Sequence, residues 1–289
     1  MSFYTKVAMR LFSHPSEAVS PYFTEIKVNL KKARIKSSLQ EYVSMAMLTS
    51  FLIFLFELPL LSFILAIFLK SFLFSFITSF TISIFLTVIF FFIFINYPRV
   101  IMKEKSKNLD NSLPFASLYL STITGSKLPL HKTFEIFSKF SKYGEITEEI
   151  IAIKNDMDVF GLDINTALER AVDRTPSKSF KELLWGILSV NRAGGDLNAY
   201  LKEKSTSFIN EYRRKLYEFS HQLTMYIEIY LTSVVIGAIF FTILTSIMSG
   251  ITGAGTNIIV LQFLLIFIFL PLISLAFIIM IKSSTPGGE

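Results

Sequence analysis

Apolar and polar positions divide the chain into five parts. Residues 44–96 and 223–282 are strongly apolar, whereas residues 1–43 and 97–222 are polar and charged. Each apolar block is too long for a single membrane span of ~20 residues and fits two. The pattern therefore predicts four transmembrane helices, two in each block, with residues 283–289 as a flexible tail.

The ends of the spans follow from the few polar residues inside the blocks. We place them near Ser44–Ala66, Phe74–Asn96, Ile227–Met248 and Ile258–Ile281, with turns around Lys70 and Gly253. A break at Glu57-Leu58-Pro59 is the alternative, because it would create a third short span in the first block.

Helical periodicity dominates the long polar region, residues 97–222. Apolar residues recur there at i, i+3, i+4, i+7 and i+8, first in Ile164, Ala167, Leu168, Ala171 and Val172 and then in Phe180, Leu183, Leu184, Ile187 and Leu188. This spacing is typical of amphipathic helices. The region has about six such segments and no strand signal. The predicted fold is therefore an all-α membrane protein with a cytosolic antiparallel helical bundle of about six helices.

A repeated motif marks two corners of this bundle. The pattern G-x-D-[I/L]-N-x-x-L begins at Gly161 and recurs at Gly194, where Gly195 is the intervening residue. The glycine suits the left-handed conformation that ends a helix. Two residues later, Asp163 or Asp196 suits the N-cap of the next helix. A third corner is expected at Gly125, with Pro129 at the first position of the following helix.

Composition and charge set the topology. Hydrophobic residues make up 52% of the 289 residues, the mean hydropathy is +0.55 and there is no cysteine. The net charge is +6, and of the 28 Lys/Arg seven lie in residues 1–43 and nineteen in residues 97–222. Positive residues concentrate on the cytoplasmic side of a membrane. Both termini and the central bundle are therefore expected in the cytoplasm.

The basic segment 1–43 has two interpretations. A helix over about Phe23–Ser44 would present basic residues to anionic headgroups. Alternatively, the same helix is solvated and packs on the rest of the protein. Neither interpretation requires nucleic acid, and no nucleic-acid-binding module is recognisable.

Candidate chemistry is sparse. Glu57 and Glu228 are the ionisable groups within or beside the spans, and such residues are functional hypotheses by default. Glu57 suits a small ion-coupled transporter or channel, or a structural or interfacial role. His14, His131 and His221 have no metal-binding spacing. No catalytic residue, cofactor or metal is expected, and Trp185 is expected in the core.

Basic residues beside the corners suggest a partner surface. Lys127, Lys132, Arg174 and Lys178 are predicted to be exposed at the end of the bundle farthest from the membrane. These four residues would form a cationic rim at that end of the bundle, which suits a partner protein with an acidic surface.

The order of these motifs resembles a known family. The succession S/T-G-x-x-L-P-L from Thr124, G-x-D-x-x-x-A-L from Gly161, T-P-S from Thr175 and A-G-G-D-L-x-x-Y-L from Ala193 is similar to the type II secretion F domain. This domain belongs to the membrane platform proteins of type II secretion, type IV and Tad pili and the archaellum. Tyr97-Pro98-Arg99 and Leu113-Pro114 look closest to the archaellum and Tad branch.

The resemblance implies a use and a set of partners. It implies a platform in the cell membrane that couples a cytosolic hexameric secretion ATPase to the assembly of pilin-like subunits. Many members carry two such domains and this sequence shows one, which implies a dimer with itself or with a sister platform protein. The sequence leaves open which filament or secretion system is involved.

Overall fold

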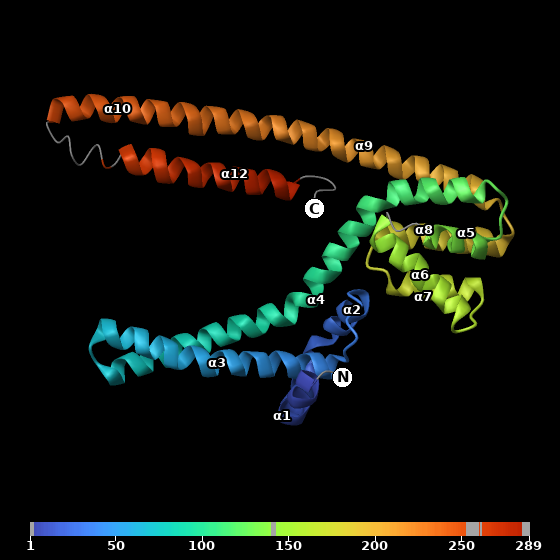
Figure 1. Ribbon diagram of the computed structural model, residues 1–289, viewed down its shortest axis with the longest axis horizontal. Coiled ribbons are helices and arrows are strands. Elements are labelled where there is room, and N and C mark those ends of the chain that lie inside the picture. Colours follow the sequence, from blue (N-terminus) through green and yellow to red (C-terminus); the bar gives the residue numbers. More distant parts are fainter. Residues whose placement is uncertain (1–2, 140–142, 253–259, 261, 285–289) are drawn as a thin grey trace. The chain divides into compact units, whose positions relative to one another are not determined.

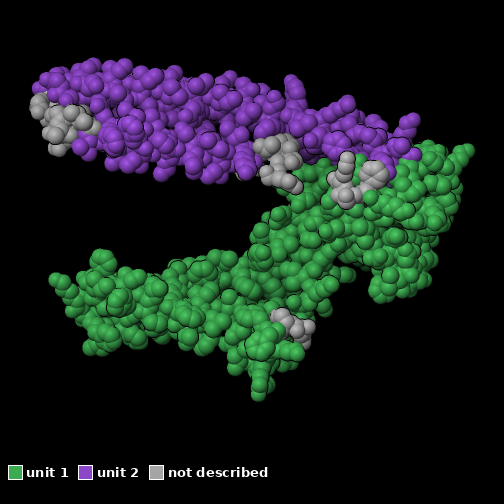
Figure 2. All heavy atoms as spheres, in the orientation of Figure 1, with its two compact units in different colours: residues 1–112, 123–200 green, residues 113–122, 201–289 purple. Residues whose placement is uncertain are grey.

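The computed structural model describes residues 3–139, 143–252, 260 and 262–284. Helices are the only regular elements in these ranges, so the protein is all-α. The described residues form two compact units, residues 1–112 with 123–200 (unit 1) and residues 113–122 with 201–289 (unit 2), which are coloured separately in Figure 2. The predicted bundle region, 97–222, is thus divided between the two units.

Four helices among the described residues are long and apolar enough to cross a membrane. They are Leu39–Phe68, Phe72–Thr124, Leu197–Ile251 and Gln262–Lys282. The first helix runs through Pro59 without ending, so the alternative of a third short span in this block is wrong. The predicted turn at Gly253 and the end of the tail, residues 285–289, lie outside the described residues.

Unit 1 begins with short helices that pack on the first apolar helix. These are α1 (Phe3–Val19), the 3-10 helix η1 (Ser20–Phe23) and α2 (Thr24–Lys32), followed by α3 (Leu39–Leu69). Figure 1 shows α1 and α2 beside the N-terminal part of α3. Ile26 and Leu30 of α2 are buried in one cluster with Tyr42, Val43 and Ala46 of α3. This packing anchors the N-terminal segment at the start of the first span.

The expected helix Phe23–Ser44 is interrupted. Arg34 has a left-handed backbone (φ 58°), and α2 ends just before it. A new helix then starts at Leu39, because the side chain of Ser38 accepts a hydrogen bond from the backbone N–H of Glu41 while Glu41 accepts one from the backbone N–H of Ser38. This reciprocal pair is a capping box, and its S-x-x-E signature was present in the sequence.

The first two apolar helices form an antiparallel hairpin. Lys70, in the left-handed region (φ 51°), ends α3, and α4 (Phe72–Thr124) starts two residues later. Near the open end of the hairpin the hydroxyl of Tyr42 donates to the carbonyl of Phe94 at 2.8 Å. Closer to the turn, the rings of Phe54 and Phe80 lie 6.0 Å apart. The predicted turn at Lys70 is therefore correct.

The bundle part of unit 1 follows α4. It consists of α5 (Leu130–Ser138), α6 (Glu145–Asp158), α7 (Ile164–Arg174) and α8 (Lys178–Ala193), and then the start of α9 (Leu197–Ile229). Its core includes Phe134, Phe137, Ile146, Ile150, Ile153, Ala167, Leu168, Ala171, Val172, Phe180, Leu183, Leu184, Ile187 and Leu188, all buried. The last nine of these positions belong to the two predicted apolar stripes. Trp185, by contrast, is 46% exposed, because one residue beyond Leu184 the helix has turned by about 100°.

Unit 2 contains the second apolar block. Helix α9 continues through a π-helical segment, η3 (Tyr230–Ile236), into α10 (Gly237–Thr252), and η4 (Leu265–Phe269) leads into α12 (Leu270–Ser284). Polar side chains join these two apolar helices. Gln262 Nε2 donates to Thr245 Oγ1 at 2.8 Å, and the hydroxyls of Tyr230 and Ser274 lie 2.9 Å apart. Interhelical hydrogen bonds of this kind commonly hold membrane helices together.

Candidate functional site

The three predicted corners of the bundle lie at one end of unit 1. The charge of Asp158, at the end of α6, acts on Lys132 near the start of α5, so the α4–α5 and α6–α7 corners are neighbours. Asn191 Nδ2 of α8 donates to Asn165 Oδ1 of α7 at 3.0 Å, which brings the α8–α9 corner to the same end. Because α4 runs from the first hairpin toward this end, we call the three corners the distal corners.

The glycine–aspartate chemistry of two corners is as the sequence predicts. Gly161 (φ 63°) and Gly194 (φ 65°) have left-handed backbones, whereas Gly195 does not. Asp163 Oδ2 accepts from the backbone N–H groups of Asn165 and Thr166 at 3.0 and 3.3 Å. Asp196 Oδ1 accepts from Asn198 and Ala199 in the same way, at 2.9 and 3.1 Å. These bonds satisfy donors at each helix start that would otherwise be free.

The hydrogen bonds also change the ionisation of Asp163. The hydroxyl of Thr166 donates to this carboxylate, and together with the backbone N–H donors it lowers the pKa of Asp163 below its ordinary value. Hydrogen bonding to the charged form favours that form.

The third corner differs from its prediction. The left-handed residue between α4 and α5 is Lys127 (φ 55°), not Gly125. Pro129 is the N-cap of α5 rather than its first helical residue. Pro129 has an extended backbone (φ −56°, ψ 148°), so the proline sits one position earlier than expected.

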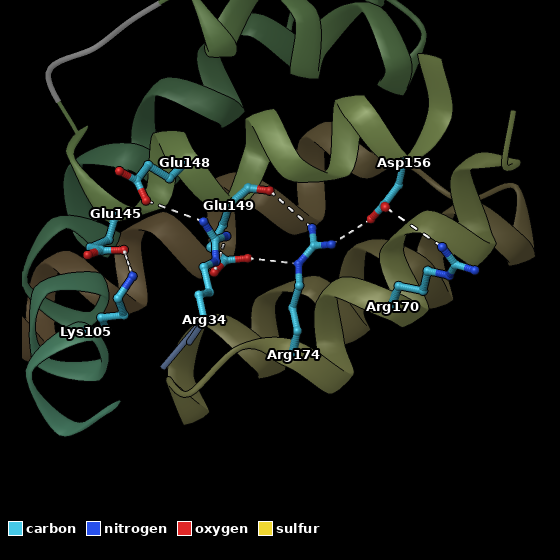
Figure 3. Close-up of polar contacts among 8 residues, drawn as sticks. All are labelled: Arg34, Lys105, Glu145, Glu148, Glu149, Asp156, Arg170 and Arg174. Carbon is cyan, nitrogen blue, oxygen red and sulfur yellow. Dashed lines mark hydrogen bonds and ion pairs between the residues drawn. The ribbon is translucent and has the colours of Figure 1, made fainter. Parts of the chain in front are cut away.

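An ion-pair cluster runs along α6 and α7, starting from the end of the bundle opposite the distal corners. Figure 3 shows Glu149 between Arg34 and Arg174, and Asp156 between Arg174 and Arg170. Glu149 is only 3% exposed and Asp156 7% exposed. Buried carboxylates need compensating charges, because desolvation of an unpaired charge is costly. The arginines supply that compensation.

Arg174 is the centre of this cluster. Its Nε lies 3.2 Å from Glu149 Oε2, and its Nη1 donates to Asp156 Oδ2 at 2.6 Å. Its side chain is 18% exposed. The prediction that Arg174 is a free cation at a partner surface is therefore wrong. The carboxylates that bind it lie on the buried side of α6, beside Ile146, Ile150 and Ile153.

Arg34 connects the N-terminal segment to the same carboxylate. Its Nη2 lies 2.6 Å from Glu149 Oε1, and its Nη1 lies 3.4 Å from Glu148 Oε2. Nη2 is buried without an aligned hydrogen bond, so its contact with Glu149 is an ion pair. Lys105 of α4 adds a contact of 3.4 Å to Glu145. The cluster thus joins the loop after α2, α4, α6 and α7.

The proposed cationic rim is divided between the two ends. Ser177, beside Lys178, donates to Asp110 of α4 at 2.6 Å. Lys127 follows the end of α4 at Thr124, roughly 20 Å further along that helix. Lys178 and Arg174 are therefore not at the distal corners, whereas Lys127 and Lys132 are exposed there. Their neighbours include exposed apolar side chains, with Val159 72% and Phe160 66% exposed.

The two predicted intramembrane carboxylates differ. Glu57 Oε2 is buried and has no hydrogen-bond partner among the described residues, and the same holds for Ser83 Oγ and Thr87 Oγ1 of α4. Glu228, near the end of α9, is exposed. Within the described ranges, no group of three or more His, Cys, Asp or Glu side chains could hold a metal ion.

This architecture defines an all-helical membrane protein with four candidate spans and a helical bundle. Residues 116–245 match the family model described as type II secretion system (T2SS), protein F. This match covers less than half of the chain and supports the resemblance found in the sequence. The likeness to the archaellum and Tad branch rests on the sequence motifs alone.

A longer archaeal protein is also similar. Over 157 residues the chain is 26% identical to Uncharacterized protein MJ1286 of Methanocaldococcus jannaschii. The alignment covers 54% of this chain and 26% of that protein, so the chain spans about a quarter of the relative's length. No solved structure matches the chain.

Proposed function

We propose that this chain is a membrane platform protein of a type IV filament or type II secretion-like machine. It couples a cytosolic hexameric secretion ATPase to the assembly of pilin-like subunits, and it acts as a dimer with itself or with a sister platform protein. The observation that carries the proposal is the family match over residues 116–245, which begins in the bundle part of α4 and extends into the third candidate span.

The path of α4 supports a mechanical role. This helix continues from the apolar hairpin into the bundle without a break, passing Pro98 on the way. Helix α4 is therefore a direct covalent connection between a candidate span and α5–α8. Displacement of the bundle by a partner would reach the span through the helix rather than through a flexible linker.

The distal corners are the best placed surface for the ATPase. Lys127 and Lys132 supply exposed positive charge, and Val159 and Phe160 supply exposed apolar area. Apolar anchors within a charged rim are typical of protein interfaces. Lys132 also pairs with Glu135 at 2.8 Å, so Lys127 is the cation with fewer local constraints.

A second function is favoured by one specific observation. The buried Oε2 of Glu57 has no hydrogen-bond partner among the described residues, and an intramembrane carboxylate of this kind suits a cation or proton pathway. The second candidate is therefore a small ion-coupled transporter or channel that uses Glu57.

One purification and one flux assay separate these functions. The tagged full chain, extracted gently from its native membrane, is expected to co-purify with a hexameric ATPase and pilin-like proteins. Purified chain in liposomes is expected to give no ion flux above empty liposomes. Flux that disappears in a Glu57→Gln variant, without ATPase co-purification, would overturn the platform function in favour of the transporter.

A further inference from the structure

The first nine residues of α1, Phe3–Leu11, have two different exposed sides. Phe3 is 84% and Leu11 62% exposed, with the partly exposed Val7 between them at a spacing of four residues. Residues four apart lie on one side of a helix. Lys6 and Arg10, both exposed, have the same spacing and lie along one flank of this apolar stripe. Such an arrangement is typical of a helix that lies in the surface of a membrane.

Other side chains of α1 fix it to the first span. The hydroxyls of Tyr4 and Thr49 lie 2.7 Å apart, and the rings of Phe12 and Phe51 lie 6.0 Å apart. Ser44 Oγ donates to Ser16 Oγ at 2.8 Å. All three contacts on α3 fall at the beginning of its apolar run. Helix α1 is therefore held at the level where this span would enter a bilayer.

The lipid-facing surface of α3 continues from the same level. Phe51 is 50% exposed, and farther along the helix Leu55, Phe56 and Phe63 are 54%, 73% and 71% exposed. The apolar stripe of α1 thus lies beside side chains that hydrocarbon would cover. A protein partner fits this stripe less well, because a stable protein interface takes roughly 20–30 residues a side and the stripe has three.

We propose that Phe3–Leu11 is an interfacial anchor that binds an anionic lipid surface. Phe3, Val7 and Leu11 insert at the boundary between headgroups and acyl chains, and Lys6 and Arg10 contact lipid phosphates. The inference does not depend on the platform function, because it concerns only the side chains of α1 and their position against α3.

A fluorescent probe tests the insertion. The chain has no cysteine, so Leu11→Cys gives a single labelling site for an environment-sensitive fluorophore in the full chain, reconstituted in phosphatidylcholine vesicles with phosphatidylglycerol. The probe is expected to be quenched by lipids with a headgroup-proximal nitroxide and protected from aqueous iodide. Phe63→Cys is the matched lipid-facing control and Val159→Cys the matched control at the distal corners.

Two outcomes would overturn the insertion. Quenching of the Leu11 probe by iodide to the same degree as the Val159 probe would mean that α1 is in water. Protection from both quenchers would mean that a protein surface, including a second copy of the chain, covers the stripe.

The charge requirement is tested separately. Each basic side chain near an anionic surface contributes about a fivefold factor in partitioning. In Lys6→Gln/Arg10→Gln the gain in lipid quenching on adding phosphatidylglycerol should therefore be lost. Lys178→Gln/Lys181→Gln, with the same change in net charge on α8, should keep it. An equal gain in lipid quenching on adding phosphatidylglycerol in the two double variants would overturn the role of Lys6 and Arg10.

Discussion

Arg174 of α7 holds Glu149 of α6 in the protein interior, with Nε 3.2 Å from Oε2. The carboxylate is nearly inaccessible and the guanidinium mostly buried, so neither charge has water to replace its partner. Contacts of this kind differ from surface ion pairs, whose contribution to stability is small. The pair fixes α6 against α7 where the N-terminal segment also makes contact.

Removal of Arg174 is expected to destabilise the bundle. Arg174→Gln leaves Glu149 and Asp156 as buried carboxylates short of positive charge, which should cost about 3 kcal/mol. Thermal unfolding of the full chain in detergent or nanodiscs measures the effect. Arg192→Gln is the control, because Arg192 pairs with Glu169 on the exposed surface of the same bundle. Similar melting temperatures for the two variants would show that the pair around Glu149 is not a buried one.

Adjacent glycines at the α8–α9 corner should respond differently to alanine. Gly194→Ala places a Cβ on a left-handed backbone and should cost about 1 kcal/mol. Gly195 does not have a left-handed backbone, and the atom nearest to the Cβ of Gly195→Ala would be Val190 Cγ1, at an ordinary contact distance of 3.4 Å. Gly195→Ala should therefore melt close to the unmodified protein. An equal loss in both variants would argue against the left-handed helix end at Gly194.

The cap at Asp163 should give a pH-dependent contribution to stability. Its folded pKa is lowered, chiefly by the Thr166 hydroxyl, so the cap stabilises the protein fully above the unfolded pKa of about 4. The contribution is lost as the pH falls through the folded pKa. The difference in melting temperature between the unmodified protein and Asp163→Ala should therefore shrink below about pH 4. A difference that is the same at pH 3 and pH 7 would contradict a charged cap.

Topology remains a prediction from the distribution of positive charge. Reporter fusions after Lys70 should be extracytoplasmic, and fusions at Gly144 and at the C-terminus should be cytoplasmic. A C-terminus and a Gly144 site on opposite sides of the membrane would show that the second apolar block does not cross twice.

The fold was largely predictable because its signals are local. Apolar spacing placed the bundle helices, and the glycine and aspartate at two corners followed from the requirements of helix ends. A further local signal lies at the start of α3. Ser38 and Glu41 have the spacing of a capping box, and this spacing indicates that a helix starts there, which divides the expected helix Phe23–Ser44.

The ion-pair cluster was not predictable in the same way. Arg34, Glu149 and Arg174 are far apart in the sequence, and only the fold brings them together. A partial signal existed, since Glu149 and Asp156 occupy positions on the stripe of Ile146, Ile150 and Ile153. Gly186 was also missed. A Cβ there would overlap the phenolic ring of Tyr200, a close approach that no local pattern reveals.

The most direct test of the platform account is ATPase binding by variants at the two ends of the bundle. Lys127→Glu/Lys132→Glu changes the distal corners, and Lys178→Glu/Lys181→Glu makes the same charge change on exposed positions at the start of α8. Co-purification of the hexameric ATPase with each full-length variant is the measurement, with membrane insertion checked in parallel. The account predicts weaker ATPase recovery for the distal variant and normal recovery for the other, with the loss in the distal variant largest at low salt and smaller as salt is raised. Normal recovery with the distal variant, or an equal loss in both, would contradict it.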